Sequence, residues 1–263
     1  MVGHSFGAAT TVEVLRHTDR FSWVSQGIIY DIWGMVLTAA HDDPRHRIHA
    51  PILMINSEAF MYWPANFEVA KSVAEEAQAQ GAPCWLMTVR GTVHIAQSDF
   101  CVLYPYLASF VMKQAIDPIR AIDLNITASL EFLSRVLPLP RKPFHRSLDD
   151  MQILDLPCLK ELPSEHQPLE KWMAVRIKMP HEFRKRLTMQ AWRKKFQQEL
   201  WKKGEREVWM HVSPSKDGLR RFEEGKMGKE GTDQTGPMPE KRGADGTPGL
   251  ETANGTTQPA DPS

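Results

Sequence analysis

The sequence has few cysteines and no net charge. The three cysteines, Cys84, Cys101 and Cys158, are an odd number without C-x-x-C spacing, which argues against a disulfide framework and a zinc site. The 32 basic and 32 acidic residues cancel, so the chain lacks the basic excess of a dedicated nucleic-acid-binding protein, and we expect no nucleic-acid partner. Since 42% of the 263 residues are hydrophobic, a globular enzyme or binding domain remains.

Long hydrophobic runs are also missing. No stretch approaches the roughly 18 consecutive apolar residues of a membrane-spanning helix. The first residues, Met1 to Ser5, do not resemble a secretory signal peptide. We therefore expect an intracellular, cytoplasmic protein from a reducing compartment, without a transmembrane segment.

Residues 1–137 alternate between strand-like and helix-like patterns. Apolar runs of strand length cover 26–30, 51–56 and 84–89, whereas helical spacing covers 6–17, 66–80 and about 98–114. Buried strands that alternate with helices predict an α/β fold, a mostly parallel sheet with helices on both faces.

Three further segments follow this domain. Six prolines mark 138–170 as a linker or an irregular wrap over the surface. Residues 171–224 are predicted to form a basic helical extension, and 181–203 fit a basic amphipathic helix. That helix could contact a membrane surface or pack on the domain. Residues 225–263 hold eight of the sixteen glycines and no aromatic residue, which predicts a disordered tail.

A possible nucleophile stands near the start of the chain. Gly3-His4-Ser5-Phe6-Gly7 fits the G-x-S-x-G motif, in which small neighbours let the backbone bend sharply and expose the serine hydroxyl. A helix-forming segment follows at once, as this strand-to-helix elbow requires. Ser5 is the predicted nucleophile, and an ordinary glycine-rich turn is the alternative.

A serine nucleophile needs a histidine base and a carboxylate that orients it. Asp31 directly follows one predicted strand and His94 follows another, where the carboxyl ends of parallel strands gather reactive groups. Either residue could instead be a turn or surface residue. His4 is a poor alternative base, because the elbow points neighbouring side chains apart. The histidines between 41 and 49 lack the spacing of a metal site, so no metal is expected.

Several separate stretches resemble one family, the platelet-activating factor acetylhydrolases of the plasma and intracellular type II form, which are calcium-independent phospholipases A2. The similar stretches are Gly3–Thr10, Asp31–Trp33, Ile55–Glu58 with Pro64–Asn66, Arg90–His94 with Asp99–Phe100, and the closing segments Ala121–Leu124 and Ala128–Leu133. Together they cover residues 1 to about 137, and the combination is far more specific than the serine motif alone.

This resemblance implies an α/β-hydrolase fold and a reaction. The substrate would be a phospholipid, a glycerophosphocholine whose short or oxidised sn-2 acyl ester is hydrolysed without a metal or other cofactor. By position, Ser5 would be the nucleophile, Asp31 the acid and His94 the base. The N–H of Phe6 would supply part of the oxyanion hole, and Trp33 would line the pocket beside the acid.

The sequence also departs from the family. The family has several strands before the serine and a second oxyanion donor in that earlier half, which have no counterpart here. We therefore expect an N-terminally truncated member without a strand leading into Ser5. Residues 138–263 have no clear family counterpart. An α/β-hydrolase for small soluble esters and an inactive lipid-associating remnant remain as alternatives.

Overall fold

A computed structural model describes residues 1–40, 42–110, 112, 114–137, 152–162 and 206–230. None of the helices in this described part has the length and apolar character needed to cross a membrane. Residues Met1–Glu224 form one compact unit. Of the second unit, Gly225–Ser263, only 225–230 are described, and they belong to a helix.

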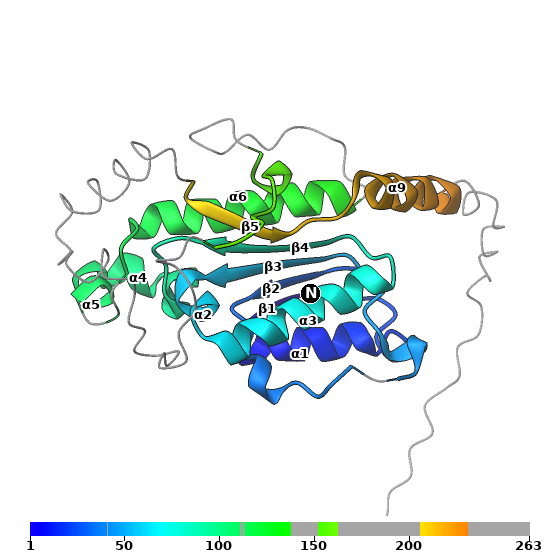
Figure 1. Ribbon diagram of the computed structural model, residues 1–263, viewed down its shortest axis with the longest axis horizontal. Helices are drawn as coiled ribbons and strands as arrows, with labels where there is room; N and C mark the ends of the chain where they lie inside the picture. Colours follow the sequence, from blue (N-terminus) through cyan, green and yellow to red (C-terminus); the bar gives the residue numbers. More distant parts are fainter. Residues whose placement is uncertain (41, 111, 113, 138–151, 163–205, 231–263) are drawn as a thin grey trace, which may run out of the picture. The chain divides into compact units, whose positions relative to one another are not determined.

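A five-stranded sheet forms the centre of the first unit (Figure 1). The strands lie in chain order: β1 (Val2–His4), β2 (Gly27–Tyr30), β3 (Ile52–Ser57), β4 (Cys84–Val89) and β5 (Val208–Val212). β1 to β4 are parallel, and β5 pairs with β4 in the antiparallel direction. The carboxyl ends of the first four strands therefore meet at one edge of the sheet.

Helices connect and cover these strands. They are α1 (Phe6–Arg16), α2 (Glu58–Met61), α3 (Pro64–Ala79), α4 (Phe100–Leu103), α5 (Pro105–Phe110), α6 (Pro118–Val136) and α9 (Lys216–Glu230), with short 3-10 turns η1 (Gly34–Val36), η2 (Pro44–His46), η3 (His94–Gln97) and η4 (Ile153–Asp155). Local sequence explains where α6 begins: Pro118 occupies its first turn, and the Asp117 carboxylate accepts hydrogen bonds from Ile119 and Arg120 N–H.

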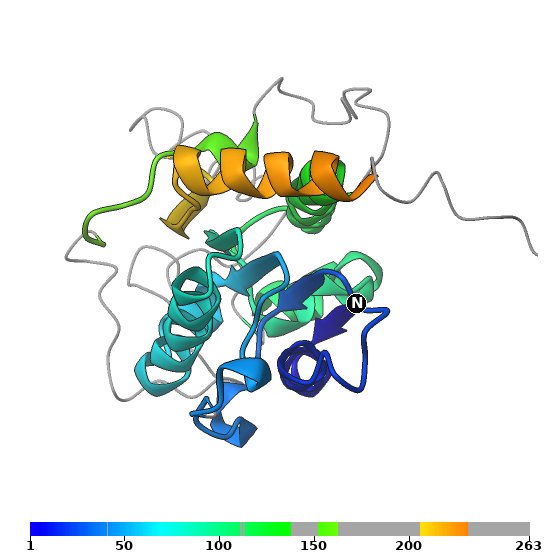
Figure 2. The ribbon, with the colours of Figure 1, turned by 90° about the vertical axis from the view of Figure 1, so that its right-hand side faces the viewer.

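Alternation of apolar side chains along the strands produces two cores. Ile52 and Met54 of β3 pack with α1 and α3, whereas Leu53 and Ile55 pack with α6. Successive side chains of a strand point to opposite faces, so a fully apolar strand must be covered on both. Figures 1 and 2 show α1 and α3 on one face of the sheet and α6 on the other. The predicted α/β fold is confirmed.

Within residues 1–137 the fold differs from the sequence prediction in two places. A strand, β1, does lead into Ser5, although this strand is only three residues long, Val2–His4. The helix predicted over 98–114 is two short helices, α4 and α5, with Pro105 at the start of the second. Proline cannot donate the backbone hydrogen bond that would continue a helix, which accounts for the interruption.

The segments after residue 137 also differ from the prediction. Within the proline-rich 138–170, the described residues 152–162 include η4, whose Ile153 and Leu154 are buried against α6. The extension predicted to be helical contains strand β5 as well as α9, and α9 continues to Glu230 in the predicted tail. The amphipathic segment 181–203 and residues 231–263 lie outside the described residues.

Candidate active site

Ser5 occupies a sharp turn between β1 and α1. Its backbone has φ 59° and ψ −119°, a left-handed conformation that costs a non-glycine residue about 1–3 kcal/mol. Gly3 permits the turn, because a Cβ at this position would lie 2.2 Å from the Gly7 carbonyl oxygen and 2.4 Å from Thr11 Oγ1. A Cβ on Gly7 would meet nothing within 4 Å. The two glycines of the motif thus contribute unequally to the geometry.

This inequality gives a matched pair of variants. Gly3→Ala is expected to destabilise the protein by about 1–3 kcal/mol or more, because α1 must move away from β1. Gly7→Ala is expected to be neutral or to stabilise by up to about 1 kcal/mol, since alanine favours a helix. Chemical denaturation of both variants measures the difference. Equal stabilities would contradict the close contact between β1 and α1.

Asp31 directly follows β2 and is fully buried. Its backbone also lies in the left-handed region, with φ 42°. The Ser57 N–H donates to Oδ1, and the Ser57 hydroxyl donates to Oδ2 at 2.6 Å. Because Ser57 is the last residue of β3, the neighbouring strand holds the carboxylate in place.

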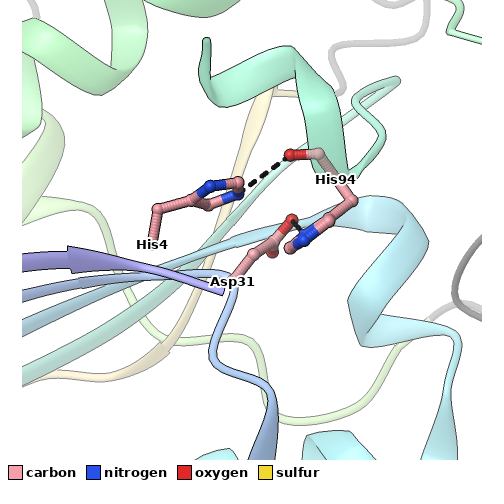
Figure 3. Close-up of side chains that lie close together, drawn as sticks. All are labelled: His4, Asp31 and His94. Carbon is pink, nitrogen blue, oxygen red and sulfur yellow. Dashed lines mark hydrogen bonds and ion pairs between the residues drawn. The ribbon is translucent and has the colours of Figure 1, made fainter. Parts of the chain in front are cut away.

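His94 lies between Ser5 and Asp31. Its Nδ1 is 3.1 Å from Asp31 Oδ2, and its Nε2 is 2.8 Å from Ser5 Oγ (Figure 3 draws the contact with Asp31). An ionised carboxylate only accepts hydrogen bonds, so Nδ1 carries the proton and Nε2 is free to accept the Ser5 proton. The three predicted residues form a continuous hydrogen-bonded series, the connectivity by which a serine becomes a nucleophile.

His4 contacts His94 but lies outside this series. Its Nε2 lies 3.1 Å from the His94 carbonyl oxygen, and the two rings are 4.5 Å apart (Figure 3). Burial, and next the neighbouring His94, lower the pKa of His4 from its ordinary value. A carbonyl oxygen only accepts, so His4 Nε2 donates to it. His4 therefore helps to hold His94, whereas the nitrogen that bonds the Ser5 hydroxyl is His94 Nε2.

Aromatic rings surround the base. The Phe60 ring is stacked on the His94 ring at 4.2 Å, with 6° between their planes. Half-buried Trp33 has its ring 6.5 Å from His94, 5.3 Å from Trp63 and 6.1 Å from Phe60. Trp33 thus lies close to the base His94, and its role as a wall of the substrate pocket stays a prediction. The rings make one side of the site apolar.

Phe6 is the first residue of α1, so its N–H has no carbonyl partner within the helix. The helix N-terminus beside Ser5 also attracts negative charge. Both features suit a donor to an oxyanion formed at Ser5. The Phe6 side chain points away from the core and is 62% exposed.

Two groups of side chains in the described part of the chain could offer metal ligands: His4, Asp31 and His94; and His17, Asp19 and His46. In the first, a metal would compete with the hydrogen bonds that join His94 to Ser5 and Asp31. The second lies around the end of α1, where the two imidazole rings are 4.9 Å apart. His49 instead donates to the Pro44 carbonyl, and His41 is outside the described residues.

The sequence motifs assign no role to Ser57, Phe60 or Trp63. The strand-end rule that selected Asp31 and His94 applies equally to Ser57, which ends a buried strand, and could have found it. Phe60 and Trp63 carry no such signal. Phe60 reaches His94 because α2 lies over the loop after β4, and Trp63 in turn packs on Phe60.

Comparison with known proteins agrees with the family predicted above. Residues 1–154 match the family model described as platelet-activating factor acetylhydrolase, isoform II. A platelet-activating factor acetylhydrolase of Gallus gallus is 35% identical over 143 residues, which cover 54% of this chain and 32% of that protein. The corresponding protein of Canis lupus familiaris is 35% identical over 147 residues, covering 55% and 30%.

A more distant relative comes from Schizosaccharomyces pombe. This putative phospholipase A2 is 28% identical over 164 residues, which cover 51% of the present chain and 36% of the relative. The chain thus spans about a third of the length of the curated relatives it matches. No solved structure shows significant similarity to it.

Proposed function

The chain belongs to the family of platelet-activating factor acetylhydrolase, isoform II, and on that premise we propose that it is a serine esterase for short-chain phospholipids. Its substrate would be the sn-2 acetyl or short acyl ester of a glycerophosphocholine such as platelet-activating factor. The observation that carries the proposal is the hydrogen-bonded series from Ser5 through His94 to Asp31, residues that follow the carboxyl ends of β1, β4 and β2.

The mechanism follows from the protonation of the three side chains: Ser5 carries a hydroxyl proton, and His94 carries a proton on Nδ1 and none on Nε2. Ser5 Oγ attacks the acyl carbonyl while His94 Nε2 takes the hydroxyl proton, and Asp31 stabilises the resulting imidazolium. The Phe6 N–H donates to the oxyanion, a contribution typically worth about 10²–10³ in kcat for one donor. His94 then gives its proton to the departing glycerol oxygen. A water molecule, deprotonated by His94, releases the acyl group from Ser5.

Apolar side chains next to the site favour a lipid substrate. Phe6 adjoins Ser5, and α4 packs against η3, the turn that begins at His94. On α4, α5 and the residue between them, large hydrophobic side chains are exposed: Val102, Leu103, Tyr104, Tyr106 and Leu107. Contiguous exposed apolar residues mark surfaces that bind lipids or other partners. The proposed membrane contact through 181–203 concerns residues outside the described part.

Turnover of matched substrates tests the proposal. We expect the full 263-residue chain to release acetate from 1-alkyl-2-acetylglycerophosphocholine at least about 10-fold faster than it releases palmitate from the sn-2 palmitoyl analogue. EDTA should not change the rate, because no step uses a metal. p-Nitrophenyl acetate serves as a soluble ester. Hydrolysis of that ester alone would favour a hydrolase for small esters. No turnover, and no labelling of Ser5 by a fluorophosphonate, would favour a non-catalytic lipid-associating protein.

A further inference from the structure

Strand β5 lies beyond residues 1–154, the part that the family model matches, and pairs with the strand that leads to His94. Val208 lies opposite Val89, the last residue of β4, because the two strands are antiparallel. The pairing continues one residue further: the Arg90 N–H donates to the Glu207 carbonyl at 2.8 Å. The start of β5 therefore reaches the loop 90–93, which carries His94.

The side chain of Arg90 is enclosed by this strand. Arg90 is 1% exposed, and its guanidinium carbon lies 4.3 Å from the centre of the Trp209 ring. Its Nη1 also donates to the Arg206 carbonyl at 3.4 Å. A guanidinium that is removed from water needs such partners, and an indole face is a favourable one. Trp209 therefore supplies an aromatic face for the side chain of Arg90, the first residue of the loop.

Glu207 fixes the start of β5 to another element. Its carboxylate accepts hydrogen bonds from Arg120 of α6, at 2.7 Å from Nη2 and 3.0 Å from Nε. Glu207 is 4% and Arg120 8% exposed, so this ion pair is screened little by water and constrains both partners. The start of β5 cannot shift without breaking the pair.

The other side of the loop is held by the family-matched part of the chain. The Gly91 N–H donates to Glu58 Oε2, and the Gly91 carbonyl accepts from the N–H groups of Ala115 and Ile116. The Glu58 N–H donates to Thr92 Oγ1 at 3.2 Å. The loop is thus fixed from the β3 side by Glu58 and from the opposite edge by β5.

We propose that Trp209 and Glu207 are positioning residues for His94. They hold Arg90, and through it the loop, so that His94 Nε2 stays 2.8 Å from Ser5 Oγ. This inference rests on the proposed function. A displacement of about 1 Å in a reacting group can cost about 100-fold in rate. A segment outside the family match would then be required for the chemistry as well as for the sheet.

Substitutions of Trp209 in the full chain test this role. Trp209→Leu keeps an apolar side chain but removes the ring face, and we expect kcat for p-nitrophenyl acetate to fall about 10–100-fold while KM changes little. Trp209→Phe keeps a ring face for Arg90, so it should retain most of kcat. The rate of fluorophosphonate labelling of Ser5 should follow kcat in both variants.

Met210→Ala is the matched control. Met210 belongs to the same strand and is 1% exposed, but it packs in the core on the α6 face. Its truncation should lower the melting temperature and leave kcat unchanged below that temperature. A wild-type kcat in Trp209→Leu, or an equal loss of kcat in Met210→Ala, would overturn the positioning role. Failure of the unchanged chain to label at Ser5 would instead count against the proposed function itself.

Discussion

Ser5→Ala is expected to abolish covalent labelling by a fluorophosphonate and to lower kcat for ester hydrolysis by about 10⁴-fold or more. The variant removes the Ser5 hydroxyl, which lies 2.8 Å from His94 Nε2, and leaves the acid and base in place. The rate that remains would come from binding and the oxyanion donor. Mass spectrometry after labelling, with kcat on p-nitrophenyl acetate, provides the measurement.

Ser72→Ala is the control, because Ser72 is exposed on α3 and its hydroxyl bonds only the Glu68 carbonyl of its own helix. It should label and turn over like the unchanged chain.

Ser5→Gly adds an independent readout. Glycine tolerates φ 59° without strain, so its free energy of unfolding should exceed that of Ser5→Ala by about 1 kcal/mol. Full labelling of Ser5→Ala would assign the nucleophile elsewhere.

Short-range patterns were sufficient to predict most of the site. The motif around Ser5 requires a strand, a tight turn and a helix, and the apolar runs before Asp31 and His94 have the length typical of buried strands. Because parallel strands place their carboxyl ends at one edge, the predicted parallel sheet already placed Asp31 and His94 at the same edge. The distances confirm that they lie close together.

Non-local contacts were beyond prediction. β5 pairs with a strand more than 100 residues earlier, and nothing within Val208–Val212 specifies an edge position next to β4. Propensity for strands depends strongly on such surroundings. The amphipathic pattern of 181–203 instead favours a helix in this extension. Likewise, the ring stacking of Phe60 on His94 depends on the path of α2, which no spacing in the sequence encodes.

The surroundings of Asp31 show why a carboxylate is needed there. Three groups donate hydrogen bonds to its two oxygens: the Ser57 N–H, the Ser57 hydroxyl and the His94 Nδ1–H. A carboxylate satisfies all of them at once because it only accepts. The side chain is fully buried, so water cannot replace a missing partner.

Asp31→Asn is therefore expected to lower kcat by about 10⁴-fold while the fold is retained. If the amide oxygen accepts the Ser57 N–H, the amide nitrogen faces His94 Nδ1 and donates to it. His94 must then carry its proton on Nε2, where it can no longer accept the Ser5 proton. If the amide is turned the other way, its nitrogen meets the Ser57 N–H, and two buried donors oppose each other.

Ser57→Ala tests how much the orientation of the Asp31 carboxylate matters when the His94 tautomer is unchanged. It removes one donor to Asp31 Oδ2 but leaves the charge and the His94 tautomer unchanged, so we expect a loss of only about 10-fold in kcat. Asp99→Asn, at an exposed carboxylate on the segment after His94, should match the unchanged chain. Steady-state kinetics and circular dichroism of the three variants measure these effects. A kcat for Asp31→Asn within 10-fold of the unchanged chain would mean that another group orients His94.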